Sequence, residues 1–298
     1  MEKHYVENVI IKQRMVDGMV KDKTEFIAEV GINHNGDMKL VKEMIDMAVI
    51  CKVDVVKFQK RNPDKAVPEH QKNVEKIVPW RQEKTTYLQY KHDIELSKED
   101  YDEINTYCKA RDIKWTASVW DLDSLEFICK YDVPFIKIPS ALLTHTELLR
   151  ACKASGKKVY LSTGMSTESE VNTAVETLGD SLDVLFHCNS SYPAKDNELN
   201  LSYLTMMKLN YPNVRIGYSG HEEGISACVV AKVLGAEVFE RHITLSRSMW
   251  GTDQAASIVF DQLYKLRRDL DKVNDWIGLP IKTVTESEIP IRKKLRGV

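Results

Sequence analysis

The chain has 298 residues, of which 43% are hydrophobic and 29% are charged, and its formal net charge is −2. This length suits one large α/β domain or two ordinary ones. The near-neutral charge does not favour nucleic acid or an anionic membrane as the main partner, and no apolar run is long enough to span a bilayer. The N-terminus has no apolar signal core, and the six cysteines are scattered without a CxxC pair. We therefore expect reduced thiols and a cytoplasmic location.

Residues 1–24 are expected to form an N-terminal extension, a short hairpin in which Val6–Ile11 and Met19–Lys21 flank an Asp17-Gly18 turn. From residue 25 onward, strand-like runs alternate with amphipathic segments. The expected strands are Glu25–Ile32, Asp54–Lys60, Lys114–Trp120, Phe135–Ser140, Lys158–Gly164, Asp183–Asn189, Val214–Gly220 and Glu237–Thr244. The expected helices include Lys39–Ile50, Leu122–Cys129, Thr167–Thr177, Leu199–Lys208 and Ile225–Leu234. This alternation predicts an α/β fold, a (β/α)8 TIM barrel over residues 25–275, although a doubly wound sheet would show the same pattern.

Two segments depart from the alternation. Residues 61–97 carry three prolines and little periodicity. In a barrel, this connection would lie on the catalytic face as a lid or a substrate wall. Residues 276–298 are expected to form a C-terminal tail that ends in basic residues.

Two histidines occupy matching positions at the ends of the last two expected strands. His221 follows the strand Val214–Gly220, and His242 lies near the end of Glu237–Thr244. Because parallel neighbours bring their C-terminal ends to one rim, the two imidazoles would lie side by side, as a pair of metal ligands would. A structural histidine is the simpler interpretation of either residue alone, but the matched positions favour a metal pair.

Lys57 and Lys137 lie inside apolar strands of a barrel that has no exposed edge. An outward lysine would be buried against helices, which is costly, so both are expected to point inward. Together with Ser118, Ser140 and the 162–164 turn, they would form an anion pocket for a phosphate plus a carboxylate. A structural role for the two lysines is the alternative.

Three acidic positions have open roles. Glu29 lies within an apolar run, so it is expected to face a metal, a cation or a hydroxylated ligand. Asp253 follows the eighth strand and would either extend a metal shell or form a turn or helix cap. The adjacent Glu240 and Arg241 are compatible with a structural ion pair or with a substrate clamp.

Several ordered motifs together carry a resemblance to a known family. They are Ala28–Gly36, Val56–Gln59, Lys137–Ser140, Leu161–Met165, Ile216–His221 and Glu240–Thr244. With these motifs in this order, the chain resembles the sialic acid synthase (N-acetylneuraminate synthase) family from about residue 25 to residue 298. The resemblance implies a TIM barrel that condenses phosphoenolpyruvate with an open-chain amino sugar such as N-acetylmannosamine. The products would be a nine-carbon 3-deoxy-2-keto acid and inorganic phosphate.

The resemblance also implies roles for individual residues. The residues implied to bind phosphoenolpyruvate are Lys57, Ser118, Lys137, Ser140, Ser190 and Ser219. The residues implied to bind the sugar are Glu29, Gln59, Tyr192 and Asp253. His221 and His242 would bind a divalent cation, Mn²⁺ or Mg²⁺, and the implied catalytic set is Glu29, Lys57, Lys137, His221 and His242. A homodimer is the expected oligomer, because members of the family pair.

The chain also departs from the family pattern. Ala141 stands where the family often has an acidic residue, so Thr144 or His145 is expected to replace one sugar contact, and Ser190 stands where asparagine is common. Longer members continue into an antifreeze-like domain, and this chain is expected to be a short form without it. The competing hypotheses are a sister synthase for a legionaminic, pseudaminic, Kdn or smaller phosphorylated sugar acid, a Schiff-base lyase using Lys137, and a sugar-binding scaffold without turnover.

Overall fold

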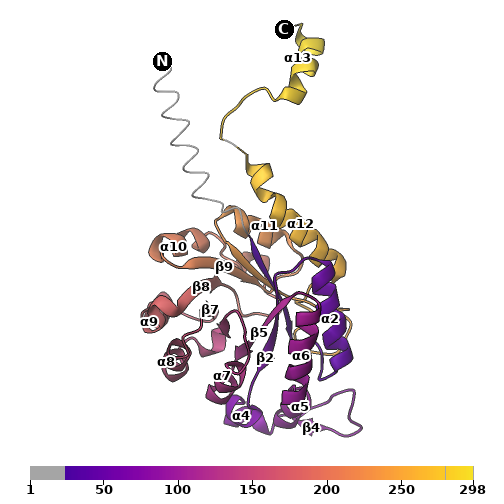
Figure 1. The fold of residues 1–298 in the computed structure, drawn as a ribbon, viewed down its shortest axis with the longest axis vertical. Coiled ribbons are helices and arrows are strands. Elements are labelled where there is room, and N and C mark those ends of the chain that lie inside the picture. The colour runs from indigo at the N-terminus through magenta and orange to yellow at the C-terminus, as the bar shows by residue number, and fades with distance from the viewer. Residues whose placement is uncertain (1–23, 279, 298) are drawn as a thin grey trace.

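The computed structural model describes residues 24–278 and 280–297, so the hairpin expected between Val6 and Lys21 lies outside the described residues. Its centre is a closed barrel of parallel strands in the order β1-β10-β9-β8-β7-β6-β5-β2 (Figure 1). The strands are β1 Glu25–Gly31, β2 Val55–Lys60, β5 Lys114–Val119, β6 Ile136–Ile138, β7 Val159–Ser162, β8 Leu182–His187, β9 Arg215–Gly220 and β10 Val238–His242. The predicted (β/α)8 TIM barrel is confirmed, and the doubly wound alternative is wrong.

Helices cover the outside of the barrel (Figure 1). They are α2 Met38–Ile50, α6 Lys98–Ala110, α7 Leu122–Ile128, α8 Thr146–Ala154, α9 Glu168–Leu178, α10 Tyr203–Asn210, α11 Ser226–Val233 and α12 Phe260–Ile277, with the 3₁₀ turns η1 Ser140–Leu142, η2 Gly179–Ser181 and η3 Asp196–Glu198. Ser97 and Thr167 begin α6 and α9 with capping boxes, which satisfy otherwise unpaired backbone donors. Helix α10 begins at Tyr203 and not at the expected Leu199, because Asn200 has a left-handed φ of 47° that a helix cannot include.

Side chains of each strand alternate between the helical layer and the barrel interior. On β1, Phe26 and Ala28 pack under the helices, whereas Ile27 points inward. The inward cluster consists of Ile27, Val55, Phe135, Tyr160, Val184, Phe186 and Val238. The rings of Phe135 and Tyr160 stack with their centroids 3.6 Å apart. The lower part of the interior is therefore packed, and space for a ligand lies at the C-terminal mouth.

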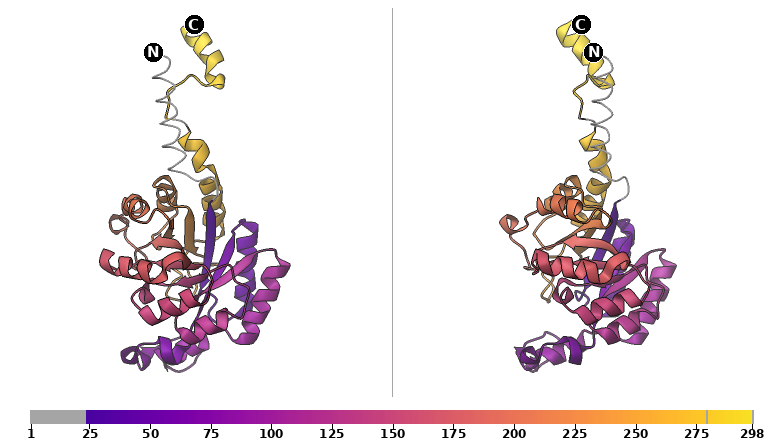
Figure 2. Two further views of the ribbon diagram at one scale, coloured as in Figure 1. Left: turned by 60° about the vertical axis from the view of Figure 1, so that its left-hand side comes forward. Right: turned by 90° about the vertical axis from the view of Figure 1, so that its left-hand side faces the viewer.

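Two segments extend from the barrel. The connection after β2 contains α3 Pro63–Ala66, α4 Glu69–Lys72, the antiparallel pair β3 Glu75–Lys76 and β4 Thr85–Thr86, and α5 Tyr87–Asp93. Figure 2 shows this connection on the side of the molecule opposite the C-terminal tail. The tail follows α12 and contains η4 Glu286–Glu288 and the exposed helix α13 Ile289–Arg296. Within residues 24–278 and 280–297, no helix is both long and apolar enough to cross a membrane.

Candidate active site

The C-terminal mouth is lined by residues that lie two positions beyond the buried inner cluster. Because the side chains of a strand alternate, a residue two positions further along points into the same interior. On β1 the inward Ile27 is thus followed by Glu29, and on β2 Val55 is followed by Lys57. The resulting polar layer contains Glu29, Lys57, Ser118, Lys137, Ser162, Ser219 and Glu240. One step higher, Gln59, His221 and His242 form the rim.

Two lysines and two carboxylates form a charged cluster in this polar layer. Lys57 Nζ lies 2.6 Å from Glu29 Oε2 and 3.5 Å from Glu240 Oε1. Lys137 Nζ lies 3.5 Å from the same Glu240 oxygen. None of the four residues is more than 5% exposed. Two positive charges therefore face two negative ones in a site that water hardly reaches, where electrostatic interactions are strong.

Burial and pairing shift the pKa values of this cluster in different directions. Burial raises the pKa of Glu29 and outweighs the nearby Lys57. Burial would also raise the pKa of Glu240, but Lys137 and Lys57 together lower it to about 2. Burial lowers the pKa of Lys137, whereas for Lys57 the attraction of Glu240 and Glu29 overcomes burial and raises the pKa. Glu240 is thus the fixed anion of the cluster, and Glu29 is the carboxylate that takes up a proton more readily.

Hydroxyl groups and a close backbone approach complete the wall beside the lysines. Lys57 donates to Ser118 Oγ at 2.9 Å, and the backbone N–H of Gly164 donates to Ser140 Oγ at 3.0 Å. A Cβ atom at Gly164 would collide with Ser190 Oγ and would meet Ser140 Oγ at 2.9 Å. Glycine is required here because two serine side chains approach the backbone.

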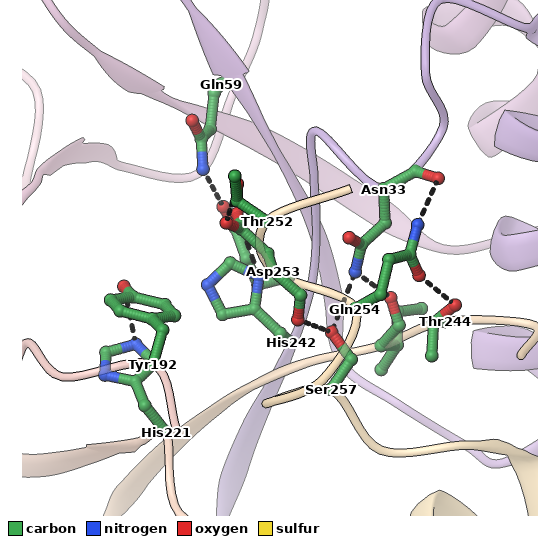
Figure 3. A network of polar contacts seen from close by, with 12 residues as sticks. Asn33, Gln59, Tyr192, His221, His242, Thr244, Thr252, Asp253, Gln254 and Ser257 are labelled. Carbon is green, nitrogen blue, oxygen red and sulfur yellow. Dashed lines mark hydrogen bonds and ion pairs between the residues drawn. The ribbon is translucent and has the colours of Figure 1, made fainter. Parts of the chain in front are cut away.

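His221 and His242 lie side by side at the rim, with ring centroids 5.6 Å apart. His221 Nδ1 is 2.6 Å from the carbonyl oxygen of Asn189, so Nδ1 carries the proton and the lone pair is on Nε2. Burial lowers the pKa of His221 to about 3, which keeps the imidazole neutral. Tyr192 packs against this ring, and its hydroxyl is 3.0 Å from Nε2 (Figure 3).

The two imidazoles fit a divalent cation. His242 Nδ1 is buried and has no hydrogen-bond partner among the residues that the structure describes, and Asp253 Oδ2 lies 3.9 Å from it (Figure 3). In the part of the chain that the structure describes, no group of three or more His, Cys, Asp or Glu side chains forms a complete metal site. A cation here would therefore have two imidazole ligands and positions left for substrate and water, as catalytic metal sites do.

The cavity at the mouth has two connected compartments. The inner compartment, of about 180 Å³, contains the charged cluster and the histidines. An outer compartment of about 420 Å³ shares Gln59, Trp120, Ala141 and Tyr192 with it. Further residues of the outer compartment are Arg61, Val67, Tyr87, Lys91, Thr252 and Asp253. The segment 61–97 therefore forms a wall of the cavity, as the sequence predicted.

The structure brings the predicted site residues together. Those that line the inner compartment are Glu29, Lys57, Gln59, Ser118, Lys137, Ser140, Ser190, Tyr192, Ser219, His221 and His242. Asp253 lines the outer compartment. Thr144 and His145 line neither, so they do not replace the sugar contact as expected. His145 Nδ1 instead accepts the backbone N–H of Leu148 and caps α8.

Glu240 is the site residue whose position the sequence analysis missed. Glu240 and Arg241 do not pair with each other, because neighbouring residues of a strand point to opposite faces. Arg241 Nη1 lies 2.7 Å from Glu222 Oε1 in a buried structural ion pair, whereas Glu240 contacts the two lysines. The signal was present in the sequence: Glu240 lies two residues before His242 and therefore on the same face of the strand.

The fold and the site define a TIM-barrel enzyme with a buried, highly polar pocket at the C-terminal mouth. The sequence pattern of the NeuB family matches residues 44–282. The chain is 34% identical over 275 residues to N-acetylneuraminate-9-phosphate synthase of Homo sapiens, which covers 90% of this chain and 75% of that protein. It is 32% identical over 271 residues to N,N'-diacetyllegionaminic acid synthase of Campylobacter jejuni, and this match covers 89% of this chain and 81% of that protein. The crystal structure of N-acetylneuraminic acid synthetase from Leptospira borgpetersenii superposes with a TM-score of 0.79 at 30% sequence identity. The superposition covers 92% of this chain and 93% of that one.

The chain belongs to the NeuB family, and the resemblance to sialic acid synthases is thereby confirmed. It is an enzyme, a transferase of the sialic acid synthase type.

Proposed function

We propose that the protein condenses phosphoenolpyruvate with an open-chain aldose of the amino-sugar class, forming a 3-deoxy-2-keto sugar acid and inorganic phosphate. The observation that carries this proposal is the convergence of Lys57 and Lys137 with His221 and His242 in one mouth of the barrel. Membership of the NeuB family supports the reaction class. Relatives named as synthases of N-acetylneuraminate 9-phosphate and of diacetyllegionaminic acid support a nonulosonate product.

The charged cluster supports phosphoenolpyruvate as the inner ligand. Its phosphate and carboxylate match the two ammonium groups and the serine hydroxyls beside them. The proposed binding residues are Lys57, Ser118, Lys137, Ser140, Ser190 and Ser219. Because Glu29 and Glu240 already balance the lysines, the bound substrate adds negative charge. A proton on Glu29, whose pKa is raised by burial, would offset part of that charge.

His221 and His242 are the proposed ligands of a divalent cation, Mn²⁺ or Mg²⁺. The neutral His221 and the unpaired Nδ1 of His242 support this assignment. When bound, such a cation polarises a carbonyl oxygen as a Lewis acid. Gln59, Tyr192 and Asp253 lie around the same rim and would orient the sugar.

Glu29 is the proposed proton donor and acceptor of the reaction. C3 of phosphoenolpyruvate attacks the aldehyde carbon, water adds at C2, and phosphate leaves with cleavage of its C–O bond. Glu29 would supply a proton to the developing alkoxide or take one from the attacking water. Gln59 Nε2 donates to Glu29 Oε1 at 3.1 Å and holds the carboxyl group in place.

The test is phosphate release from phosphoenolpyruvate against a panel of aldoses, with and without a chelator. We expect turnover that chelation abolishes and that Mn²⁺ or Mg²⁺ restores. His221→Ala should lose this metal-dependent turnover, whereas His70→Ala, at an exposed histidine of α4, should retain it. Unchanged activity in His221→Ala would show that turnover does not require a metal bound by His221. Absence of phosphate release with every aldose would refute the synthase function.

We further propose that residues 25–275 form the synthase domain, followed by the tail 276–298, and that the protein acts as a homodimer in the cytoplasm. The exposed rings of Phe260 and Tyr264, which stack on α12 with centroids 6.4 Å apart, offer apolar surface for a second copy. Light scattering of the purified protein tests the oligomer, and the mass of a single chain would refute it.

A further inference from the structure

Two cationic side chains of the outer compartment have no part in the reaction described above. Arg61 and Lys91 both line this compartment, and each is only 6% exposed. Lysine and arginine are almost never buried to this degree unless they are paired. The partners that these two residues have within the protein therefore decide whether they are structural.

Within the part of the chain that the structure describes, Lys91 has no anionic partner of its own. It lies on α5, and its ammonium group lies 4.9 Å from the ring centroid of Tyr90 and 5.2 Å from that of Tyr87. Among residues 24–278 and 280–297, no carboxylate forms an ion pair with Lys91, although the charges of Asp253 and Glu95 act to raise its pKa. Burial, reinforced by the nearby charge of Arg61, lowers the pKa of Lys91 to about 7.

Arg61 keeps donor capacity that the protein does not use. Its Nη2 donates to Gln59 Oε1, and its guanidinium carbon lies 4.5 Å from the ring centroid of Trp120. Its Nε is buried with no hydrogen-bond partner among the described residues, and Glu95 Oε2, at 3.8 Å, is close enough for an ion pair but not for a hydrogen bond. Glu95 is already engaged by Lys60, whose Nζ lies 2.7 Å from Oε1.

The outer compartment therefore has an excess of positive charge. Of the described residues that line it, Arg61 and Lys91 are cationic and only Asp253 carries a carboxylate. The compartment opens from the inner one, with which it shares Gln59 and Tyr192. In the proposed reaction the aldehyde end of the acceptor lies at the histidines, so the opposite end of an extended sugar points toward the two cations.

We propose that the acceptor is a phosphorylated aldose, and that Arg61 and Lys91 bind a phosphate monoester on the carbon farthest from the aldehyde. The inference rests on the proposed synthase function and specifies its substrate class. A phosphate monoester carries roughly two negative charges at neutral pH, which match one guanidinium fork and one ammonium group. With a neutral sugar, Lys91 would keep no anionic partner among the described residues and Arg61 would keep only the long 3.8 Å contact with Glu95, which is unfavourable for buried cations.

The experiment compares each aldose of the panel with its terminal phosphate ester, starting with N-acetylmannosamine and N-acetylmannosamine 6-phosphate. The full chain is assayed with phosphoenolpyruvate and a divalent cation, and phosphoenolpyruvate consumption is followed. We expect kcat/KM to be at least about tenfold higher for the phosphate ester, the effect of one charge-assisted contact. Lys91→Met and Arg61→Gln should each lower that ratio by about tenfold. Lys65→Gln, at a 59% exposed lysine of the same segment, should leave the ratio unchanged.

The outcomes separate this inference from the proposed function. Turnover of free aldoses with equal or lower kcat/KM for their phosphate esters would overturn the phosphate site and leave the synthase function standing. If no aldose is turned over, calorimetric binding of N-acetylmannosamine 6-phosphate decides the inference. Binding that is lost in Lys91→Met would support the phosphate site, and binding that is absent from the wild type or unaffected by the substitution would overturn it.

Discussion

Replacing Lys137 with glutamine should weaken phosphoenolpyruvate binding as well as destabilise the fold. Lys137 donates to Ser162 and lies 3.5 Å from Glu240 Oε1, with 2% of its surface exposed. A charge-assisted hydrogen bond is worth about 1.5–3 kcal/mol, so its loss should raise the KM for phosphoenolpyruvate about 10- to 150-fold. Breaking a buried ion pair costs up to about 3–5 kcal/mol. After the substitution Glu240 still has Lys57 Nζ 3.5 Å away, so we expect the free energy of unfolding to fall by less, about 1–3 kcal/mol.

The assay measures initial rates of phosphate release as phosphoenolpyruvate is varied at a saturating aldose concentration. The matched control is Lys158→Gln, a 67% exposed lysine just before β7, with its Nζ 3.5 Å from Asp183 Oδ2. The control should leave both KM and Tm close to those of the wild type, because an exposed pair contributes little. A Lys137→Gln protein with a lowered Tm but a wild-type KM would refute the anion-pocket reasoning.

Gly164→Ala should raise the KM for phosphoenolpyruvate about tenfold, because the Cβ of the new alanine would displace Ser190 and Ser140. Steady-state kinetics tests this, and an unchanged KM would contradict it. Glu29→Gln should lower kcat by about 10²–10⁴-fold with less effect on either KM, and a kcat near the wild-type value would exclude proton transfer by Glu29. Because the pKa of Lys91 is about 7 and not its ordinary 10.5, the folded chain binds fewer protons than the unfolded chain between these values. The contribution of Lys91 to stability therefore rises with pH across this window, and urea unfolding of Lys91→Met should show a flatter pH dependence than the wild type. An equally steep pH dependence of the unfolding free energy in Lys91→Met and the wild type would contradict this prediction.

Much of the fold and of the inner compartment could be read from local patterns. The alternation of strands and helices depends on periods of about two and 3.6 residues, which are properties of the backbone and need no tertiary contact. The position of Lys57 within an apolar strand was enough to predict that it points into a closed barrel. Applied to the last strand, the same alternation would also have placed Glu240 beneath His242. That residue was missed because the adjacent Arg241 suggested a local pair.

Other features depend on contacts between segments that are distant in the chain. Closure of the barrel brings β10 beside β1, and this allows Glu240 to balance Lys57 and Lys137, which lie on different strands. The excess charge at Arg61 and Lys91 arises because the segment after β2 folds back over the mouth, while Glu95 pairs more closely with Lys60, at 2.7 Å, than with Arg61, at 3.8 Å. Local sequence reveals which way a side chain points, but the charge of a pocket is a sum over groups that chain folding brings together. The inner site was therefore predictable in outline, whereas its charge balance and the cationic outer compartment emerged from the packed structure.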